Sequence, residues 1–232
     1  MLLVFAVIAM LWLRASGQTV SVTGQVKTYG ANQNHATQAV VWLTPIAQTV
    51  SDASQAKPIH AALRQKNKTF EPHILVVTKG STVDFPNLDP WFHNVFSLFN
   101  GKKFDLGLYE AGTSRTVHFD REGISYIFCN IHPEMSAVVV VLSTPYYAQA
   151  TKSGEFLIAG VPPGRYRLHL WSENSFPDAL QGLSREIEVS GITQFAGVFR
   201  VPENETAKVQ HKNKYGQDYE PPSPSNPVYS QP

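Results

Sequence analysis

Short stretches in which apolar and polar residues alternate recur along most of the chain. The first runs from Gln18 to Tyr29, and a second covers Ala39 to Thr44. Alternation with a period of two is typical of strands buried on one face. Turn residues separate further predicted strands at 73–79, 81–85, 94–98, 114–119, 124–129 and 136–143. The pattern predicts an all-β fold built around a sandwich.

The predicted strand at 136–143 is apolar along its whole length, which is typical of a strand buried on both faces. A second β pattern begins at Tyr146, with alternating apolar positions at 156–158 and again at 166–170. It predicts a second small β-sandwich. We hypothesise that the strands at 22–29 and 39–44 belong to this second body, so that the first sandwich is inserted between its two halves.

The two ends of the chain differ from this strand pattern. An apolar run from Leu2 to Leu13 is shorter than the roughly 20 residues that a membrane-spanning helix needs, and small residues follow at Ala15 and Gly17. We interpret residues 1–17 as a signal peptide and expect export to a periplasmic or extracellular space, with no integral membrane segment after cleavage. Residues 201–232 are rich in Pro, Ser, Asn and Gln and predict a disordered tail.

Composition narrows the classes of function. The 232 residues carry a formal net charge of +1, with no basic stripe, so nucleic acid is not an expected partner. The chain has a single cysteine, Cys129. Oxidising compartments favour paired cysteines, so a lone cysteine in an exported protein needs a partner or a reactive role.

The sequence around Cys129 provides that role. His132 and Met135 follow it at intervals of three, in a C-x-x-H-x-x-M arrangement where a predicted strand ends. His93 opens an earlier predicted strand and supplies a second imidazole. A thiolate, two imidazoles and a weak axial thioether are a ligand set that selects copper. We therefore predict one mononuclear copper ion, as Cu(I) or Cu(II), bound by His93, Cys129, His132 and, more weakly, Met135.

With this motif, the region from about 73 to 143 resembles the cupredoxins of the plastocyanin and amicyanin type, and the spacing of its loop is most similar to amicyanin. The mature chain also resembles plastocyanin-like proteins associated with methylamine utilisation. The resemblance implies a Greek-key sandwich and a blue, type 1 copper centre. It also implies that Asn94, directly after His93, helps to tie the two ligand segments together by hydrogen bonds.

A second resemblance concerns residues 154–171, which look like the small carboxypeptidase regulatory-like, or transthyretin-like, β-sandwich. The expected division is a signal peptide at 1–17, an N-terminal β segment at 18–57, a cupredoxin domain at 58–145, a β module at 146–200 and a tail at 201–232. The first of these segments is the one hypothesised to pair with the module.

These features favour one-electron transfer to or from a redox protein, and not an enzyme. No His-x-His pair that could hold further copper centres is present. The alternative is a copper-storage protein, or a carbohydrate- or protein-binding β-sandwich without a redox role. Aromatic and apolar residues near His132 are either a docking patch or ordinary core. Glycosylation triplets begin at Asn67 and Asn204, and the sequence does not decide whether they are used.

Overall fold

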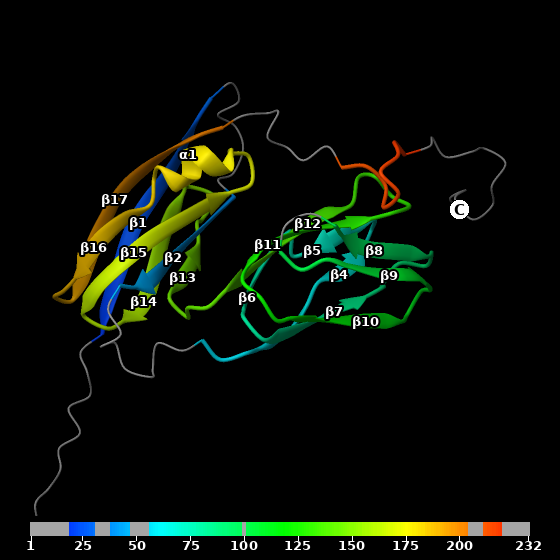
Figure 1. Ribbon diagram of the computed structural model, residues 1–232, viewed down its shortest axis with the longest axis horizontal. Coiled ribbons are helices and arrows are strands. Elements are labelled where there is room, and N and C mark those ends of the chain that lie inside the picture. Colours follow the sequence, from blue (N-terminus) through cyan, green and yellow to red (C-terminus); the bar gives the residue numbers. More distant parts are fainter. Residues whose placement is uncertain (1–18, 31–37, 47–55, 99–100, 204–210, 220–232) are drawn as a thin grey trace, which may run out of the picture.

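The computed structural model describes residues 19–30, 38–46, 56–98, 101–203 and 211–219. Within them the fold is all-β, as predicted, with one short helix, α1 (Pro177–Gln181). Figure 1 shows two layered β bodies side by side, which we call the site-bearing sandwich and the flanking sandwich. Among the described helices, none has the length and apolar character required to span a bilayer.

The site-bearing sandwich consists of a five-stranded sheet, a three-stranded sheet and a small hairpin. The larger sheet has the order β6 (Ile74–Thr78), β12 (Ser136–Leu142), β11 (Gly123–Cys129), β8 (His93–Ser97) and β9 (Phe104–Tyr109). The smaller has the order β10 (Ser114–Phe119), β7 (Ser81–Pro86) and β3 (His60–Ala62). The hairpin pairs β4 (Arg64–Lys66) with β5 (Thr69–Glu71). Phe85, Val95, Phe119 and Ile127 belong to the buried core between these strands.

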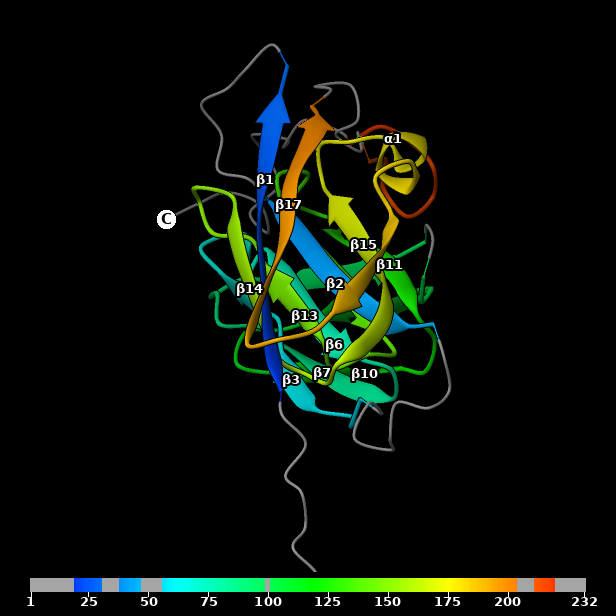
Figure 2. The same ribbon diagram turned by 90° about the vertical axis from the view of Figure 1, so that its left-hand side faces the viewer.

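The flanking sandwich is built from both ends of the described chain. One sheet has the order β14 (Glu155–Val161), β1 (Val20–Tyr29) and β17 (Thr193–Pro202). The other has the order β13 (Tyr147–Gln149), β2 (Ala39–Pro45), β15 (Gly164–Ser172) and β16 (Arg185–Val189). β1 pairs with β14 and β17, and β2 pairs with β15, as Figure 2 shows. These are the ladders that the insertion hypothesis requires.

The strand β12 forms a wall shared by the two bodies. Val139 and Val141 face the core of the site-bearing sandwich. Val138 and Val140 point the other way, into a core cluster that also contains residues of the flanking sandwich such as Leu170. Because side chains alternate along a strand, both faces are buried, as the apolar run predicted. The two sandwiches therefore share a hydrophobic interface.

The described residues differ from the sequence-based expectations in a few places. The strands β3, β4, β5, β9, β13, β16 and β17 and the helix α1 had no predicted counterpart. The signal peptide and most of the tail lie outside the described residues. One part of the tail does not fit the expected disorder, because residues 211–219 are hydrogen-bonded to the site-bearing sandwich. Composition alone could not show these contacts.

Candidate metal centre

Three side chains meet at one end of the site-bearing sandwich. His93 begins β8, Cys129 ends β11, and His132 lies in the loop formed by residues 129–135. The ladder between β11 and β8 pairs Cys129 with Val95, which brings the two segments together. The sequence analysis predicted these three residues as the main copper ligands, with Met135 as a weaker fourth. His93, Cys129 and His132 form the group of possible metal ligands found in the described residues.

The ligand atoms converge closely. The Cys129 Sγ atom lies 3.6 Å from His93 Nδ1 and 3.7 Å from His132 Nδ1, and the two Nδ1 atoms are 3.1 Å apart. A point equidistant from all three atoms lies about 2.0 Å from each, near the roughly 2.0–2.3 Å of first-row metal bonds to imidazole and thiolate. The three atoms thus fit around one metal ion.

A carboxylate fixes the orientation of His93. Its Nε2 atom lies 2.9 Å from Asp89 Oδ2, and both side chains are almost completely buried. Since a carboxylate only accepts, Nε2 carries the proton and Nδ1 presents its lone pair to the group. Metal-bound histidines commonly donate their other ring nitrogen to a carboxylate in this way. Asp89 is a functional residue that the sequence analysis missed.

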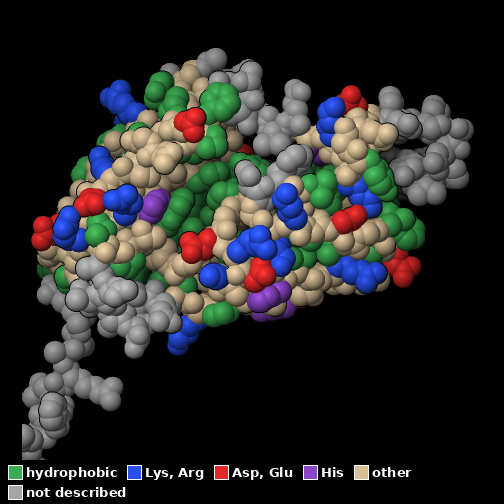
Figure 3. Space-filling view, viewed as in Figure 1, with side chains coloured by type: hydrophobic (Ala, Val, Ile, Leu, Met, Phe, Trp, Pro, Cys, Tyr) green, Lys and Arg blue, Asp and Glu red, His purple; other side chains and the backbone are tan. Residues whose placement is uncertain are grey.

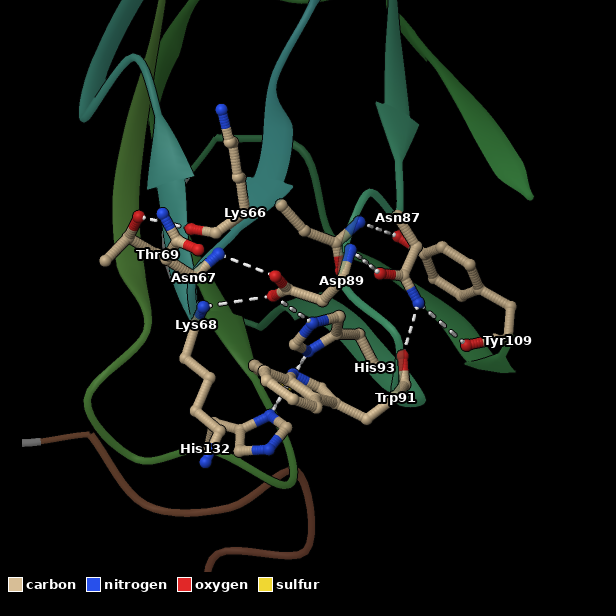
Figure 4. A network of polar contacts seen from close by, with 12 residues as sticks. Lys66, Asn67, Lys68, Thr69, Asn87, Asp89, Trp91, His93, Tyr109 and His132 are labelled. Atoms are coloured by element: carbon tan, nitrogen blue, oxygen red, sulfur yellow. Dashed lines mark hydrogen bonds and ion pairs between the residues drawn. The ribbon is translucent and has the colours of Figure 1, made fainter. Parts of the chain in front are cut away.

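Asp89 is itself held by the hairpin turn between β4 and β5 (Figure 4). Its carboxylate accepts hydrogen bonds from the backbone N–H groups of Asn67 at 2.6 Å and Lys68 at 3.0 Å. Both turn residues have a φ of 54°, as a two-residue type I′ hairpin requires. Burial disfavours ionisation of Asp89, but these N–H groups and His93 outweigh it and lower the pKa of Asp89. The turn therefore positions the carboxylate that orients His93.

The short segment before His93 is organised by Asn87. The Asn87 side chain donates to the carbonyl of Trp91 at 2.7 Å and accepts the N–H of Asp89 at 3.0 Å. An asparagine that bonds its own following backbone in this manner stabilises a tight turn. Asn87 thus fixes the course of the chain from Asp89 to His93.

Hydrogen bonds also close the 129–135 loop. The Cys129 N–H donates to the carbonyl of Met135, and the Met135 N–H donates to the carbonyl of His132. Met135 is fully buried in the same core cluster as Cys129. The Asn130 N–H donates to the backbone carbonyl of Asn94 at 2.8 Å, which ties the loop to β8.

The hydrogen bonding expected of Asn94 between the two ligand segments is made by its backbone carbonyl. Its backbone makes the link between the two segments, while its side chain donates to Asp105 Oδ1 at 2.7 Å. The resemblance had implied hydrogen bonding by Asn94 and did not separate backbone from side chain. Here the side chain connects to β9 instead of the loop.

The protonation of the three groups suits a metal ion. Burial lowers the pKa of His93, against the opposing effect of Asp89, and burial together with the nearby His93 lowers the pKa of His132 to about 4. Both imidazoles are therefore neutral near pH 7. Burial raises the pKa of the Cys129 thiol, although backbone N–H groups oppose this effect. A bound cation would displace that proton and accept the lone pairs of both imidazoles.

Each comparison with known proteins covers only part of the chain. A family model described as "Polysaccharide lyase family 4, domain II" matches residues 137–194, from β12 into β17. A search of curated proteins finds no match. Solved structures match with TM-scores near 0.3.

The matches include proteins described as a cupredoxin, an amicyanin and a Cu-containing nitrite reductase. A purple cupredoxin from Nitrosopumilus maritimus is 25% identical, with a TM-score of 0.32, over 35% of this chain and 98% of its own. A Cu(I) form of an amicyanin variant is 19% identical, with a TM-score of 0.33, over 43% of this chain and 97% of its own. A Cu-containing nitrite reductase from Thermus scotoductus SA-01 is 21% identical, with a TM-score of 0.34, over 42% of this chain and 25% of its own. The likeness is partial, so the functional argument rests on the site itself.

Proposed function

We propose that this protein transfers single electrons through a mononuclear type 1 copper centre, bound by His93, Cys129 and His132, with Met135 as a weaker axial ligand. The observation that carries the proposal is the close approach of two imidazole Nδ1 atoms to one buried thiol. Copper in such a site supplies a one-electron couple between Cu(I) and Cu(II).

The chain's own residues keep the site rigid. Asp89 holds His93, hydrogen bonds close the 129–135 loop, and β8 and β11 carry both segments on one sheet. A scaffold that holds its ligands in place limits the change in geometry between oxidation states. The Nδ1 to Sγ separations require no rearrangement to surround a metal ion. The site is therefore suited to electron transfer without a bound substrate.

A redox protein would approach at the exposed side of the site. His93 and Cys129 are fully buried, whereas His132 is partly exposed. Pro133, next to His132 in the chain, and Phe92, next to His93, are exposed, and Trp91 and Ile131 are half-buried. These residues would provide an apolar contact around the edge of His132. Charges of both signs are intermixed on the face shown in Figure 3, so this face has no uniformly basic patch of the kind that attracts nucleic acid.

We further propose that the protein is exported to a periplasmic or extracellular space and that it is not an enzyme.

The test is an optical titration with copper. The Cu(II)-loaded protein should show an intense visible band from thiolate-to-copper charge transfer, which bleaches reversibly on reduction. Cys129→Ser should abolish the band, because an alcohol does not replace the thiolate. Met135→Leu should keep copper bound, because the axial bond is weak. A colourless protein that binds only Cu(I) would instead identify a storage role.

A further inference from the structure

The end of the described chain contacts the candidate copper site. We call residues 211–219 the C-terminal strap. It follows β17 of the flanking sandwich in the sequence, after residues 204–210, yet it lies beside the site-bearing sandwich near β12 and β8, as Figure 1 shows. The strap therefore returns to the body that holds the metal ligands.

The strap bonds to the 129–135 loop at three places. The Tyr219 hydroxyl donates to the Cys129 carbonyl at 2.8 Å. The backbone N–H of Lys214 donates to Asn130 Oδ1 at 2.8 Å. His211 Nε2 donates to the carbonyl of Pro133 at 2.9 Å. These contacts lie before and after His132, so both sides of that ligand are held.

Ring stacking reinforces the hydrogen bonds. The imidazole of His211 stacks on Phe128, with ring centroids 3.9 Å apart and an interplanar angle of 20°. Because the Pro133 carbonyl only accepts, Nε2 carries the proton of a neutral His211. The Tyr219 hydroxyl lies 3.1 Å from His211 Nδ1, which is a second acceptor beside the Cys129 carbonyl for the single hydroxyl proton. His211 and Tyr219 thus form one unit against the backbone of Phe128 and Cys129.

The strap also reaches the segment that carries His93. Lys214 Nζ lies 2.8 Å from Asp105 Oδ2, and the Asp105 carboxylate accepts the side-chain amide of Asn94 at 2.7 Å. Asn94 directly follows His93 in β8. A single short segment is therefore connected to both parts of the site.

We infer that the C-terminal strap is a positioning element of the metal site, in which Tyr219 and His211 hold the backbone of the 129–135 loop from outside. That the strap influences the properties of a bound copper ion rests on the proposed function. That the strap holds the 129–135 loop in place does not depend on it. Groups that hydrogen-bond to the residues binding a metal hold those residues in place and influence the affinity and reduction potential of the metal. The strap performs that task from a segment remote in the sequence from every ligand.

The first experiment uses the metal-free full-length protein. Cys129 is the sole cysteine and is fully buried, so its reaction with an aromatic disulfide reagent reports how often the loop opens. Tyr219→Phe should accelerate labelling about two- to tenfold, the effect of losing one hydrogen bond. His211→Ala should accelerate it at least as much, because it removes a hydrogen bond and the ring stacked on Phe128. The control is Tyr29→Phe, which makes the same change as Tyr219→Phe on a side chain of β1 that is 53% exposed and lies outside the strap. It should label at the wild-type rate.

The second experiment uses the copper-loaded protein. Tyr219→Phe should retain the visible band and lower the reduction potential, because the lost hydroxyl dipole had its positive end directed at Cys129 and disfavoured Cu(II). Tyr29→Phe should have the wild-type potential. Unchanged labelling rates in both Tyr219→Phe and His211→Ala would overturn the inference, independently of the visible band and the reduction potential of the copper-loaded protein. Faster labelling without a visible band would overturn the proposed function and leave the strap's role intact.

Discussion

At the scale of single residues, the candidate site depends on how His93 is oriented. Its Nε2 atom donates to a buried carboxylate, so its Nδ1 lone pair faces Cys129 and His132. The two Nδ1 atoms are 3.1 Å apart, a distance at which a neutral His132 can donate an Nδ1–H to the His93 lone pair. A metal ion would displace that proton and accept a lone pair from each imidazole. Asp89 is therefore as important to the geometry as a ligand.

Replacing this carboxylate should weaken copper binding. In Asp89→Asn the side chain keeps its size but loses its negative charge. The carboxylate accepts a hydrogen bond from His93 Nε2–H and from two backbone N–H groups, and a neutral amide accepts these bonds less strongly. We expect the Cu(II) affinity to fall about 10- to 100-fold, as for other groups that orient a metal-bound histidine. A competition titration against a chelator of known affinity measures the change. Asp120→Asn, at a surface ion pair with Lys102, is the control and should bind copper as the wild type does. Equal affinities for both variants would contradict the role assigned to Asp89.

The residue scale also shows which part of the site was predictable. Cys129, His132 and Met135 lie close together in the sequence, so their spacing indicated the chemistry. Asp89 had a weaker signal, an acid four residues before a candidate histidine ligand, which the general preference of metal-bound histidines for carboxylates could have identified. Tyr219 and His211 gave none, because the composition of the tail suggested disorder and their contacts are made across a long separation in sequence.

At the scale of elements, strands with a clear apolar pattern were predicted and those without one were missed. The pattern at 136–143 corresponds to β12, including its two buried faces. β4 and β5 are three residues each, and their turn uses positive φ at Asn67 and Lys68 without the glycine that usually marks such a turn. β9 is an exception, because Phe104, Leu106 and Leu108 alternate in its sequence. In the structure Gly107 has a φ of 67° and the ladder to β8 shifts register, so Leu108 is exposed and Tyr109 is buried. Pairing with neighbouring strands, which sequence does not show, decides such elements.

Within the flanking sandwich, Gly24 is required by close packing in β1. A Cβ atom at this position would meet the ring of Phe156 and the backbone carbonyl oxygen of Gly197, the latter at 2.9 Å. Gly24→Ala should therefore lower the free energy of unfolding by about 1–3 kcal/mol, the usual cost of overpacking. Denaturant unfolding measures it.

The matched control is Gly182→Ala, where an added Cβ finds only ordinary contacts at 3.7 Å or more and φ is −63°. That variant should be as stable as the wild type or more stable by up to about 1 kcal/mol. If Gly24→Ala were equally well tolerated, this result would contradict the close packing of β1 against β14 and β17.

At the scale of the whole molecule, the two sandwiches behave as one packed body. β6 and β12 of the site-bearing sandwich contribute Val76, Val138 and Val140 to a cluster dominated by residues of the flanking sandwich. A polar contact lies at the same interface, where His73 joins Glu173, which follows β15. An isolated site-bearing sandwich would expose this apolar face. The flanking sandwich therefore stabilises the body that holds the site.

The contact between His73 and Glu173 should make this interface sensitive to pH. His73 Nδ1 lies 3.1 Å from the Ser136 carbonyl and Nε2 lies 2.8 Å from Glu173, so both nitrogens face acceptors and the imidazolium is favoured. The hydrogen bond to Glu173 is the largest cause of the raised pKa of His73. A group whose pKa is raised on folding stabilises the protein fully below its unfolded pKa of about 6.5, and this stabilisation disappears as the pH rises through the folded value.

Glu173→Gln should accordingly destabilise the protein more at about pH 5.5 than at about pH 9, since only the imidazolium gains from the carboxylate. The pair is partly exposed, with 36% and 21% of the two side chains accessible, so a difference of about 0.5 kcal/mol is expected, or roughly 1–2 °C in Tm. Calorimetry at both pH values measures it on the full-length protein. Glu188→Gln, an exposed change in β16, should show no such pH dependence. A deficit of equal size at both pH values would mean that Glu173 acts by packing and that the charge on His73 does not stabilise the interface.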